Sequence, residues 1–303
     1  MTGRRKPWLF SEAAERYRRR LKMDGRLSLD TERRLETLEK EFGLREVRSI
    51  TAEEVQAYVY AKYSCKKPGT INRNRSVLKA VLSVALEEGM ITTKPVIKLR
   101  KVSDARNTHL EAREIMPVVN AIRVEDGPLM GFVVLLLIDT GMRFGEMLRL
   151  VWGDLQRDWI TVRSTGKGKT KARRIPTSPR LLQYMSEYGI PPDEGDGPNT
   201  PVVLSRWTER PTTIGRRITS SLRKACVSTG AMCGDEIKPH DLRHTFAFIC
   251  ASSGADLGDI KELLGHDNIS MTMRYRGFVQ VRAAEAIRKG MAASDAKFNH
   301  EIR

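Results

Sequence analysis

Apolar residues recur at helical spacing over most of the first hundred positions. The pattern predicts one helix that Ser11 caps and that runs past Leu21, and a second helix that stops at Gly43. The segment Thr51-Ala-Glu-Glu54 has the spacing of a capping box, which predicts the start of a third helix. The sequence therefore predicts a small helical domain over residues 1–100.

A fourth helix is predicted over residues 70–88, with apolar residues along one side. Lysines and arginines in and just before this helix form a tight cluster: Lys66, Lys67, Arg73, Arg75 and Lys79. Such a helix could enter a groove of duplex DNA and neutralise phosphates, or it could be an ordinary solvated helix face. The density of the cluster favours DNA contact, so we interpret residues 1–100 as a DNA-binding domain.

Helical periodicity breaks between Thr92 and Arg106, where Pro95 interrupts the pattern. This stretch is basic, and Lys98 and Lys101 are further candidates for DNA contact. We expect a charged linker between two domains at residues 101–109.

The helical pattern resumes at Leu110, and we place a second domain at residues 110–303. An apolar helix over residues 129–138 is predicted to end at Gly141. Residues 159–163 and 172–176 alternate as strands do, and the glycine- and lysine-rich segment between them predicts a hairpin. The expected fold is therefore mostly α with a small antiparallel β-sheet, an α+β architecture.

The chain is strongly basic, with 53 Lys and Arg against 37 Asp and Glu, a net charge of +16 and a pI near 9.9. This balance suits a polyanionic partner, although a generically basic surface would look the same. The longest apolar run, residues 131–138, is too short to cross a bilayer, and the first residues lack the apolar stretch of a signal peptide. We expect a cytoplasmic, nucleoid-associated protein.

The sequence gives little support for a metal or nucleotide cofactor. Its four cysteines form no C-x-x-C pair. His240 and His244 are four residues apart, as zinc ligands on a helix can be, but the glutamate of H-E-x-x-H is missing and Arg243 would place a cation beside the metal. The lysine-rich turn near Lys167 does not match the P-loop pattern. We expect no metal and no cofactor.

Several positions of the second domain carry candidate chemistry. Arg143 opens a short predicted helix, and Glu146 is close enough in sequence to hold its guanidinium through an ion pair. His240 and Arg243 flank the start of a helix that Asp241 could cap, a place that favours an anion. Each feature is weak alone, and so are the three that complete the set: Lys167 in the hairpin turn, His266 after a glycine, and Tyr275.

The order of these features resembles that of the tyrosine site-specific recombinases, the phage integrase family. The motifs that carry the resemblance are Thr140-Gly-Met-Arg143 with Glu146, His240-Asp-Leu-Arg243-His-Thr-Phe-Ala247, and Leu264-Gly-His-Asp-Asn-Ile-Ser-Met-Thr-Met-Arg-Tyr275. The resemblance covers residues 108–280 well and the N-terminal helices more loosely. Glu111 departs from the pattern, since the family often has a capping Ser or Thr there, and Lys169 or Lys171 could take the place of Lys167.

The resemblance implies that Tyr275 attacks a DNA phosphodiester, forming a 3′-phosphotyrosine and freeing a 5′-hydroxyl. A phenol with a pKa near 10 needs a base and cationic surroundings for this attack. The implied helpers are Arg143, Arg243 and His266 on the phosphate, His240 on the tyrosine proton, and Lys167 on the leaving oxygen. Lys169 and Lys171 are further expected DNA contacts.

The resemblance also implies a C-shaped clamp on double-stranded attachment sites, strand exchange through a Holliday junction, and a homotetramer on DNA. Accessory DNA-bending or excision factors would be further partners. A helix after Tyr275 is expected to present one apolar face, which could pack on a neighbouring subunit or on its own domain. Its members are Ala283, Ala284, Ile287 and Met291.

We interpret the chain as the integrase of a phage or genomic island, because residues 8–17 and 70–96 are more similar to such integrases. The alternative within the family is a Xer-like resolvase of chromosome or plasmid dimers. A type IB topoisomerase shares the chemistry, but the short length and the N-terminal helices favour a recombinase. A catalytically silent DNA-binding protein is the alternative of another class, which the presence of every expected catalytic residue disfavours.

Overall fold

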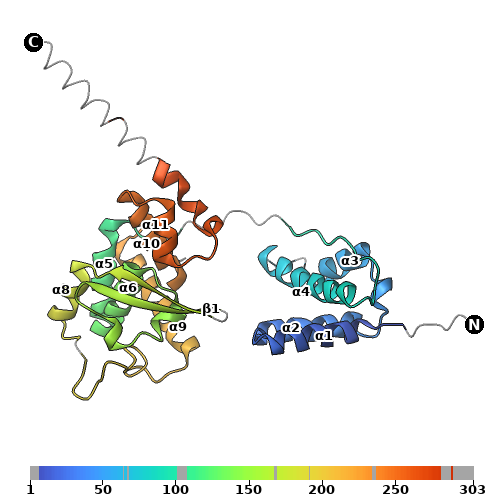
Figure 1. Ribbon diagram of the computed structural model, residues 1–303. Coiled ribbons are helices and arrows are strands. Elements are labelled where there is room, and N and C mark those ends of the chain that lie inside the picture. The colour runs from blue at the N-terminus through green and yellow to red at the C-terminus, as the bar shows by residue number, and fades with distance from the viewer. Residues whose placement is uncertain are drawn as a thin grey trace, which may run out of the picture. The chain divides into compact units, whose positions relative to one another are not determined.

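The computed structural model divides into two compact units, residues 1–105 and 106–303, which we describe separately (Figure 1). It describes residues 7–63, 65–66, 68–100, 108–166, 169–190, 192–233, 237–280 and 288. In this part of the chain no helix combines the length and the apolar character that crossing a membrane requires.

The first unit is helical, as its apolar pattern predicts. Its elements are α1 (Phe10–Met23), α2 (Leu29–Phe42), the 3₁₀ turn η1 (Val47–Ser49), α3 (Ala52–Tyr63) and α4 (Pro68–Glu87). Helices α1, α2 and α4 pack on one another around a core that includes Phe10, Leu35 and Leu82.

Two of the expected helix boundaries in this unit are met and one is not. Thr51 and Glu54 form the predicted capping box, since the Glu54 amide donates to Thr51 Oγ1 (3.2 Å) and the Thr51 amide donates to Glu54 Oε2 (3.0 Å). Helix α2 stops before Gly43, also as predicted. Ser11 does not cap α1, because the helix already begins at Phe10 and the Leu9 amide is satisfied by Glu12 Oε2 at 2.8 Å.

The predicted DNA contact of Arg75 is wrong, because this side chain is buried. It is 4% exposed, and its guanidinium donates to the carbonyl oxygen of Lys98 (2.8 Å) and to Gln56 Oε1 (2.5 Å). It follows Ile71 by four positions, so it lies on the apolar side of α4 and holds the following segment against the unit. Arg75 is therefore a packing residue and is not presented to a partner.

The other basic residues of the expected DNA surface differ from Arg75. Those that the structure describes are exposed: Lys66, Arg73, Lys79 and Lys98. Lys67 and Lys101 lie outside the described residues. Exposed ammonium and guanidinium groups on and beside α4 can reach phosphates without any rearrangement of the core.

The second unit is built around α6 (Pro128–Thr140), whose side chains are buried almost throughout. Helices α5 (Ala112–Asp126), α8 (Pro179–Glu187) and α10 (Pro239–Ser252) pack against it (Figure 1). Helix α6 ends at Gly141 with φ of +56°, the left-handed conformation that closes a helix most cheaply at glycine. The chain is thereby turned directly into the Arg143 segment.

The remaining elements bring the hairpin next to the ends of two helices. Strands β1 (Trp159–Gly166) and β2 (Lys169–Pro176) pair antiparallel, with Trp159 opposite Pro176, so the predicted hairpin is confirmed. β1 contacts α7 (Phe144–Met147), and β2 contacts α11 (Leu257–Leu264). The other elements are η2 (Trp152–Asp154), α9 (Pro211–Thr229), η4 (Ile269–Met271) and η5 (Met273–Tyr275). The predicted mostly helical fold with a small antiparallel sheet is confirmed.

Candidate active site

Three arginines from different elements converge on the C-terminal end of α11. The last carbonyl groups of a helix have no partner within the helix and carry its negative dipole end, so they attract cations. The three bonds are Arg173 Nε to the Leu263 oxygen (2.7 Å), Arg243 Nη2 to the Leu264 oxygen (2.6 Å) and Arg143 Nη2 to the Gly265 oxygen (3.1 Å). Strand β2, helix α10 and the α7 turn are thus tied to one short segment of backbone.

Gly265 allows the close approach at this helix end. Its φ is +65°, and a Cβ at this position would lie 3.1 Å from Nη1 of Arg173. A side chain would therefore be strained by the backbone and crowded by the guanidinium at once. The turn that Gly265 makes places His266 beside the three arginines.

Glu146 lies between two of the arginines. Its side chain is only 2% exposed, and its carboxylate accepts from Arg143 Nη1 (3.0 Å), Arg173 Nη2 (2.8 Å) and the Arg143 amide (2.8 Å). Burial would favour the neutral acid, but the hydrogen bonds from Arg173 and Arg143 outweigh it and lower the pKa of Glu146 to about 2. The carboxylate is therefore ionised at neutral pH and orients both guanidinium groups.

Arg243 is the most deeply buried of the three arginines, with 3% of its surface exposed. Besides its bond to the α11 end, it donates from Nη1 to the carbonyl oxygen of Gly141 at 2.7 Å. Burial, assisted by the positive charges of Arg143 and Arg173, lowers the pKa of Arg243 to about 9. A phosphate entering the cluster would relieve this repulsion, which makes the site electrostatically prepared for an anion.

His266 is also buried and faces the arginines. Its Nδ1 lies 2.9 Å from the hydroxyl of Thr272, a residue with no exposed surface. Burial first, and then the charges of Arg243 and Arg143, lower the pKa of His266 to about 4. The ring is therefore neutral at pH 7, and its second nitrogen is free of the bond to Thr272.

Tyr275 ends η5, and 5% of its surface is exposed. Its hydroxyl lies 2.6 Å from Nδ1 of His244. Burial raises the pKa of Tyr275, while the charges of Arg274 and Arg243 act in the opposite direction. The hydroxyl thus sits at the edge of the arginine cluster, in contact with a histidine.

His240 lies one helical turn before His244 on α10. It is exposed, and its ring contacts the His244 ring edge-on with centroids 5.2 Å apart. Helix α10 begins at Pro239, three residues earlier than an Asp241 cap would require, and Asp241 instead accepts from the Lys238 amide at 2.9 Å. The expected cap is therefore wrong in position, although Asp241 still satisfies the helix start from inside the first turn.

The structure brings together five of the six expected catalytic residues: Arg143, His240, Arg243, His266 and Tyr275. Lys167 lies outside the described residues, and so do the side chains of Lys169 and Lys171. The apolar helix face expected after Tyr275 also lies outside them. Glu111, the departure from the family pattern, still precedes α5, and its amide is satisfied by Glu114 Oε2 at 2.8 Å.

Three residues of the site were missed by the sequence analysis: Arg173, His244 and Arg274. His244 was weighed only as a zinc ligand, and within the described residues no three His, Cys, Asp or Glu side chains gather as a metal site would need. His244 could have been identified from the sequence because it follows Arg243 directly and therefore lies in the same turn of α10.

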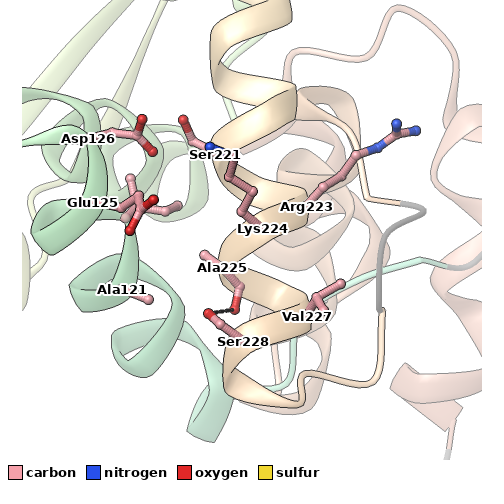
Figure 2. Close-up of a pocket in the computed structure, with 10 residues that line it drawn as sticks. Ala121, Glu125, Asp126, Ser221, Arg223, Lys224, Ala225, Val227 and Ser228 are labelled. Atoms are coloured by element: carbon pink, nitrogen blue, oxygen red, sulfur yellow. Dashed lines mark hydrogen bonds between the residues drawn. The ribbon is translucent and has the colours of Figure 1, made fainter.

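A groove of about 540 Å³ between α5 and α9 is separate from this cluster (Figure 2). Glu125 and Asp126 face Ser221 and Lys224 across it. None of its lining residues belongs to the arginine, histidine and tyrosine cluster, so the groove does not compete as the reaction site.

Residues 107–279 match the model of the phage integrase family. The chain belongs to this family, whose members are tyrosine recombinases that cleave and rejoin DNA. It is 28% identical over 240 residues to the tyrosine recombinase XerC of Lactobacillus leichmannii, covering 75% of this chain and 78% of that protein. It is 30% identical over 197 residues to XerA of Pyrococcus furiosus, covering 63% of this chain and 64% of that protein.

Solved structures of integrases share the fold. The Tn1549 transposon integrase in complex with circular intermediate DNA has a TM-score of 0.70 at 20% identity and covers 88% of this recombinase and 95% of that chain. A lambda integrase tetramer bound to a Holliday junction has a TM-score of 0.67 at 21% identity. The match covers 86% of this chain and 78% of the lambda integrase chain. The predictions of a tyrosine recombinase and of its fold are thus confirmed.

Proposed function

We propose that Tyr275 is the nucleophile of this recombinase. Its Oη attacks a DNA phosphorus, the Oη–P bond forms, and the bond from phosphorus to the 5′-oxygen breaks. The products are a 3′-phosphotyrosine and a free 5′-hydroxyl, and attack by another 5′-hydroxyl reseals the strand. The observation that supports this is that Arg143, Arg243 and His266 gather at the end of α11, and that the charge of Arg243 also acts on the Tyr275 hydroxyl.

Arg143 and Arg243 would bind the two non-bridging phosphate oxygens. A guanidinium has five N–H groups, and the side-chain bonds described above occupy two of them on each arginine. The remaining N–H groups can donate to a phosphate while the others hold the guanidinium in place. Donors fixed in this way stabilise the charge of the transition state without reorganising when it forms.

Two histidines and a lysine would complete the phosphate site. The nitrogen of His266 that does not contact Thr272 would donate to a phosphate oxygen. His240, exposed at the start of α10, would face the phosphate from the positive end of that helix. Lys167 would protonate the leaving 5′-oxygen from the hairpin turn.

The partner would be double-stranded DNA carrying two attachment sites, bound by a homotetramer. A lambda integrase tetramer on a Holliday junction, whose fold this chain shares, supports that assembly. The exposed residues Lys66, Arg73, Lys79 and Lys98 would contact the DNA backbone from the helical domain that we place at residues 1–100. We propose that a linker at residues 101–109 joins this domain to a catalytic domain at residues 110–303.

Integration or excision of a phage or genomic island is the biological reaction we favour, and Xer-like resolution is the second candidate. The identity to XerC and XerA proteins supports the second, and the similarity of the fold to transposon and phage integrases is compatible with either. Sequencing the DNA trapped on the protein in its own cells separates them. Junctions between an element and the chromosome indicate an integrase, and a single site flanked by chromosome on both sides indicates a resolvase.

The nucleophile assignment is tested with a DNA probe chosen by the protein itself. A duplex is selected from a random-sequence library for binding to the Tyr275→Phe protein, and a nick is placed beside the cleavage position to trap the intermediate. The original protein should form an adduct that survives denaturing gels, and the Tyr275→Phe protein should bind equally well and form none. Tyr188→Phe, a tyrosine outside the cluster, should keep the adduct.

An adduct with the Tyr275→Phe protein would refute the assignment. Binding without an adduct by the original protein, on every selected site, would instead favour the catalytically silent DNA-binding protein.

A further inference from the structure

Tyr275 stands at the end of a chain of three side chains joined by hydrogen bonds. Its Oη lies 2.6 Å from Nδ1 of His244, a half-buried residue of α10. One guanidinium nitrogen of Arg274 lies 2.9 Å from Nε2 of the same ring and 3.4 Å from Nδ1. The residue next to the proposed nucleophile in the sequence is therefore linked to the nucleophilic oxygen through a histidine of another helix.

The direction of each bond in this chain follows from the chemistry of the groups. A guanidinium can only donate, so Arg274 donates to Nε2, which must carry a lone pair. Burial first, and then the charge of Arg274, lower the pKa of His244 to about 4, so the ring is neutral at pH 7 and carries a single proton. That proton is on Nδ1, and His244 donates a hydrogen bond to Tyr275 Oη.

This direction decides where the proton of the tyrosine hydroxyl can go. Because the Tyr275 oxygen accepts from His244, its own proton points elsewhere and cannot be taken up by Nδ1. His240 lies one helical turn earlier on α10, is exposed, and contacts the His244 ring edge-on. His240, to which the family resemblance assigns the tyrosine proton, thus keeps that role, and His244 has a different one.

We propose that His244 is a catalytic hydrogen-bond donor to the nucleophilic oxygen, and that Arg274 positions it by fixing the ring proton on Nδ1. A lone pair of Oη forms the bond to phosphorus, and the tyrosine proton passes to His240. The electron pair of the breaking bond goes to the 5′-oxygen, which takes its proton from Lys167. His244 keeps its own proton throughout. This role rests on the proposed function of Tyr275 as the nucleophile.

The donor acts on the charge that Oη carries during the reaction. A neutral phenol is a weak nucleophile, and its oxygen gains negative charge as the proton leaves. Burial raises the pKa of Tyr275 and so disfavours that charge, whereas the charges of Arg274 and Arg243 favour it. A donor already fixed beside the oxygen adds to this stabilisation without reorganising. The same bond stabilises Oη when a 5′-hydroxyl displaces the tyrosine, so His244 should accelerate both cleavage and rejoining.

Two substitutions of His244 separate hydrogen-bond donation from proton transfer. Asparagine carries an amide nitrogen near the place of Nδ1, so His244→Asn can donate to Oη but cannot take up a proton near neutral pH. His244→Leu can do neither. On the selected nicked duplex we expect His244→Leu to form the adduct about 10²-fold more slowly, and His244→Asn to recover about 10-fold or more of that loss. Rejoining of the adduct with an added 5′-hydroxyl strand should follow the same order.

Equal losses in the two variants would overturn the proposal, because they would mean that the ring accepts a proton or only fills space. Adduct formation by His244→Leu at the original rate would overturn it as well. Urea unfolding of each variant, and DNA binding with Tyr275→Phe added, exclude loss of the fold or of affinity as the cause. Failure of the underlying reaction is distinguishable, because the original protein would then form no adduct at all.

The position of the ring proton gives a second readout, which needs no functional variant. Nitrogen NMR of the protein with isotope-labelled histidine distinguishes protonated from unprotonated ring nitrogens, and His244→Asn identifies the signals of His244. We expect a protonated Nδ1 and an unprotonated Nε2 at pH 7. A proton on Nε2 in the original protein would refute the proposal. Arg274→Leu removes the donor to Nε2, so part of the population should then carry the proton there, and an unchanged ring would refute the role of Arg274.

Discussion

Arg173 of strand β2 donates to both carboxylate oxygens of Glu146, from Nη2 to Oε2 at 2.8 Å and from Nη1 to Oε1 at 3.3 Å. The same guanidinium donates through Nε to the end of α11. The hairpin whose turn holds Lys167 is therefore fastened to the segment that holds Arg143 and His266. A rigid fastening of this kind holds the two strands that lead into the hairpin turn at a fixed place beside the site.

The carboxylate of Glu146 should stabilise the second unit in a pH-dependent way. Its pKa in the folded protein is about 2, against 4.5 for an ordinary glutamate, so its contribution is present above pH 4.5 and is lost as the pH falls toward 2. We expect Glu146→Gln to lower the free energy of unfolding at pH 7 by on the order of 3 kcal/mol, with a much smaller difference at pH 2.5.

Urea unfolding of both proteins, followed by tryptophan fluorescence at the two pH values, measures this difference. An equal loss at both pH values would mean that shape, and not the charge of Glu146, is what matters.

Gly141 should be intolerant of any side chain. Its φ is +56°, and an added Cβ would lie 2.5 Å from Phe246 and 2.9 Å from Leu264. Gly189 has a matching φ of +58° with open space around it, so Gly189→Ala isolates the backbone cost of about 1 kcal/mol. We expect Gly141→Ala to lower the free energy of unfolding by about 3 kcal/mol, because overpacking is added to that cost.

Chemical denaturation of the two variants side by side checks the difference between them. Equal losses would show that Phe246 and Leu264 move aside without cost, and that the helix end is less tightly packed than its distances indicate.

Local patterns in the sequence predict the elements well because the forces that form them are local. The capping box at Thr51, the helix stop at Gly141 and the hairpin at 159–176 each depend on residues close together in the chain. The burial of Arg75 could also have been predicted from local spacing. Its spacing from Ile71 and Leu78 places it on the apolar side of the helix, whereas the prediction of a DNA contact was based on its charge alone.

The contacts that complete the site are of another kind. Arg173 and Glu146 are 27 positions apart, and His244 and Tyr275 are 31 apart. No periodicity within a helix or strand relates such pairs, because they meet only after α10, α11 and the hairpin have packed. The family motifs therefore predict which residues belong to the site, while the identity of the partner that bonds each one comes from the tertiary arrangement.

Lys79 and Arg75 should separate DNA binding from stability in the first unit. Lys79 is exposed on α4, whereas Arg75 is buried and bonded to Gln56 and the Lys98 backbone. If Lys79 neutralises one phosphate, Lys79→Ala should reduce the slope of log K against log salt by about 0.9 and leave unfolding unchanged. Arg75→Ala should leave the slope intact and lower the free energy of unfolding by about 2 kcal/mol, since two hydrogen bonds and their packing are lost.

The measurement is binding of the Tyr275→Phe protein to its selected duplex across a salt series, with each substitution added to that background so that no cleavage intervenes. Arg73→Ala serves as a second exposed position and should behave as Lys79→Ala does. A fall in slope for Arg75→Ala would show that the buried guanidinium leaves its partners to reach DNA. An unchanged slope for both exposed variants would instead mean that this side of α4 is an ordinary solvated helix face, the alternative reading of the basic cluster. Any DNA contact of the first unit would then be made by other residues.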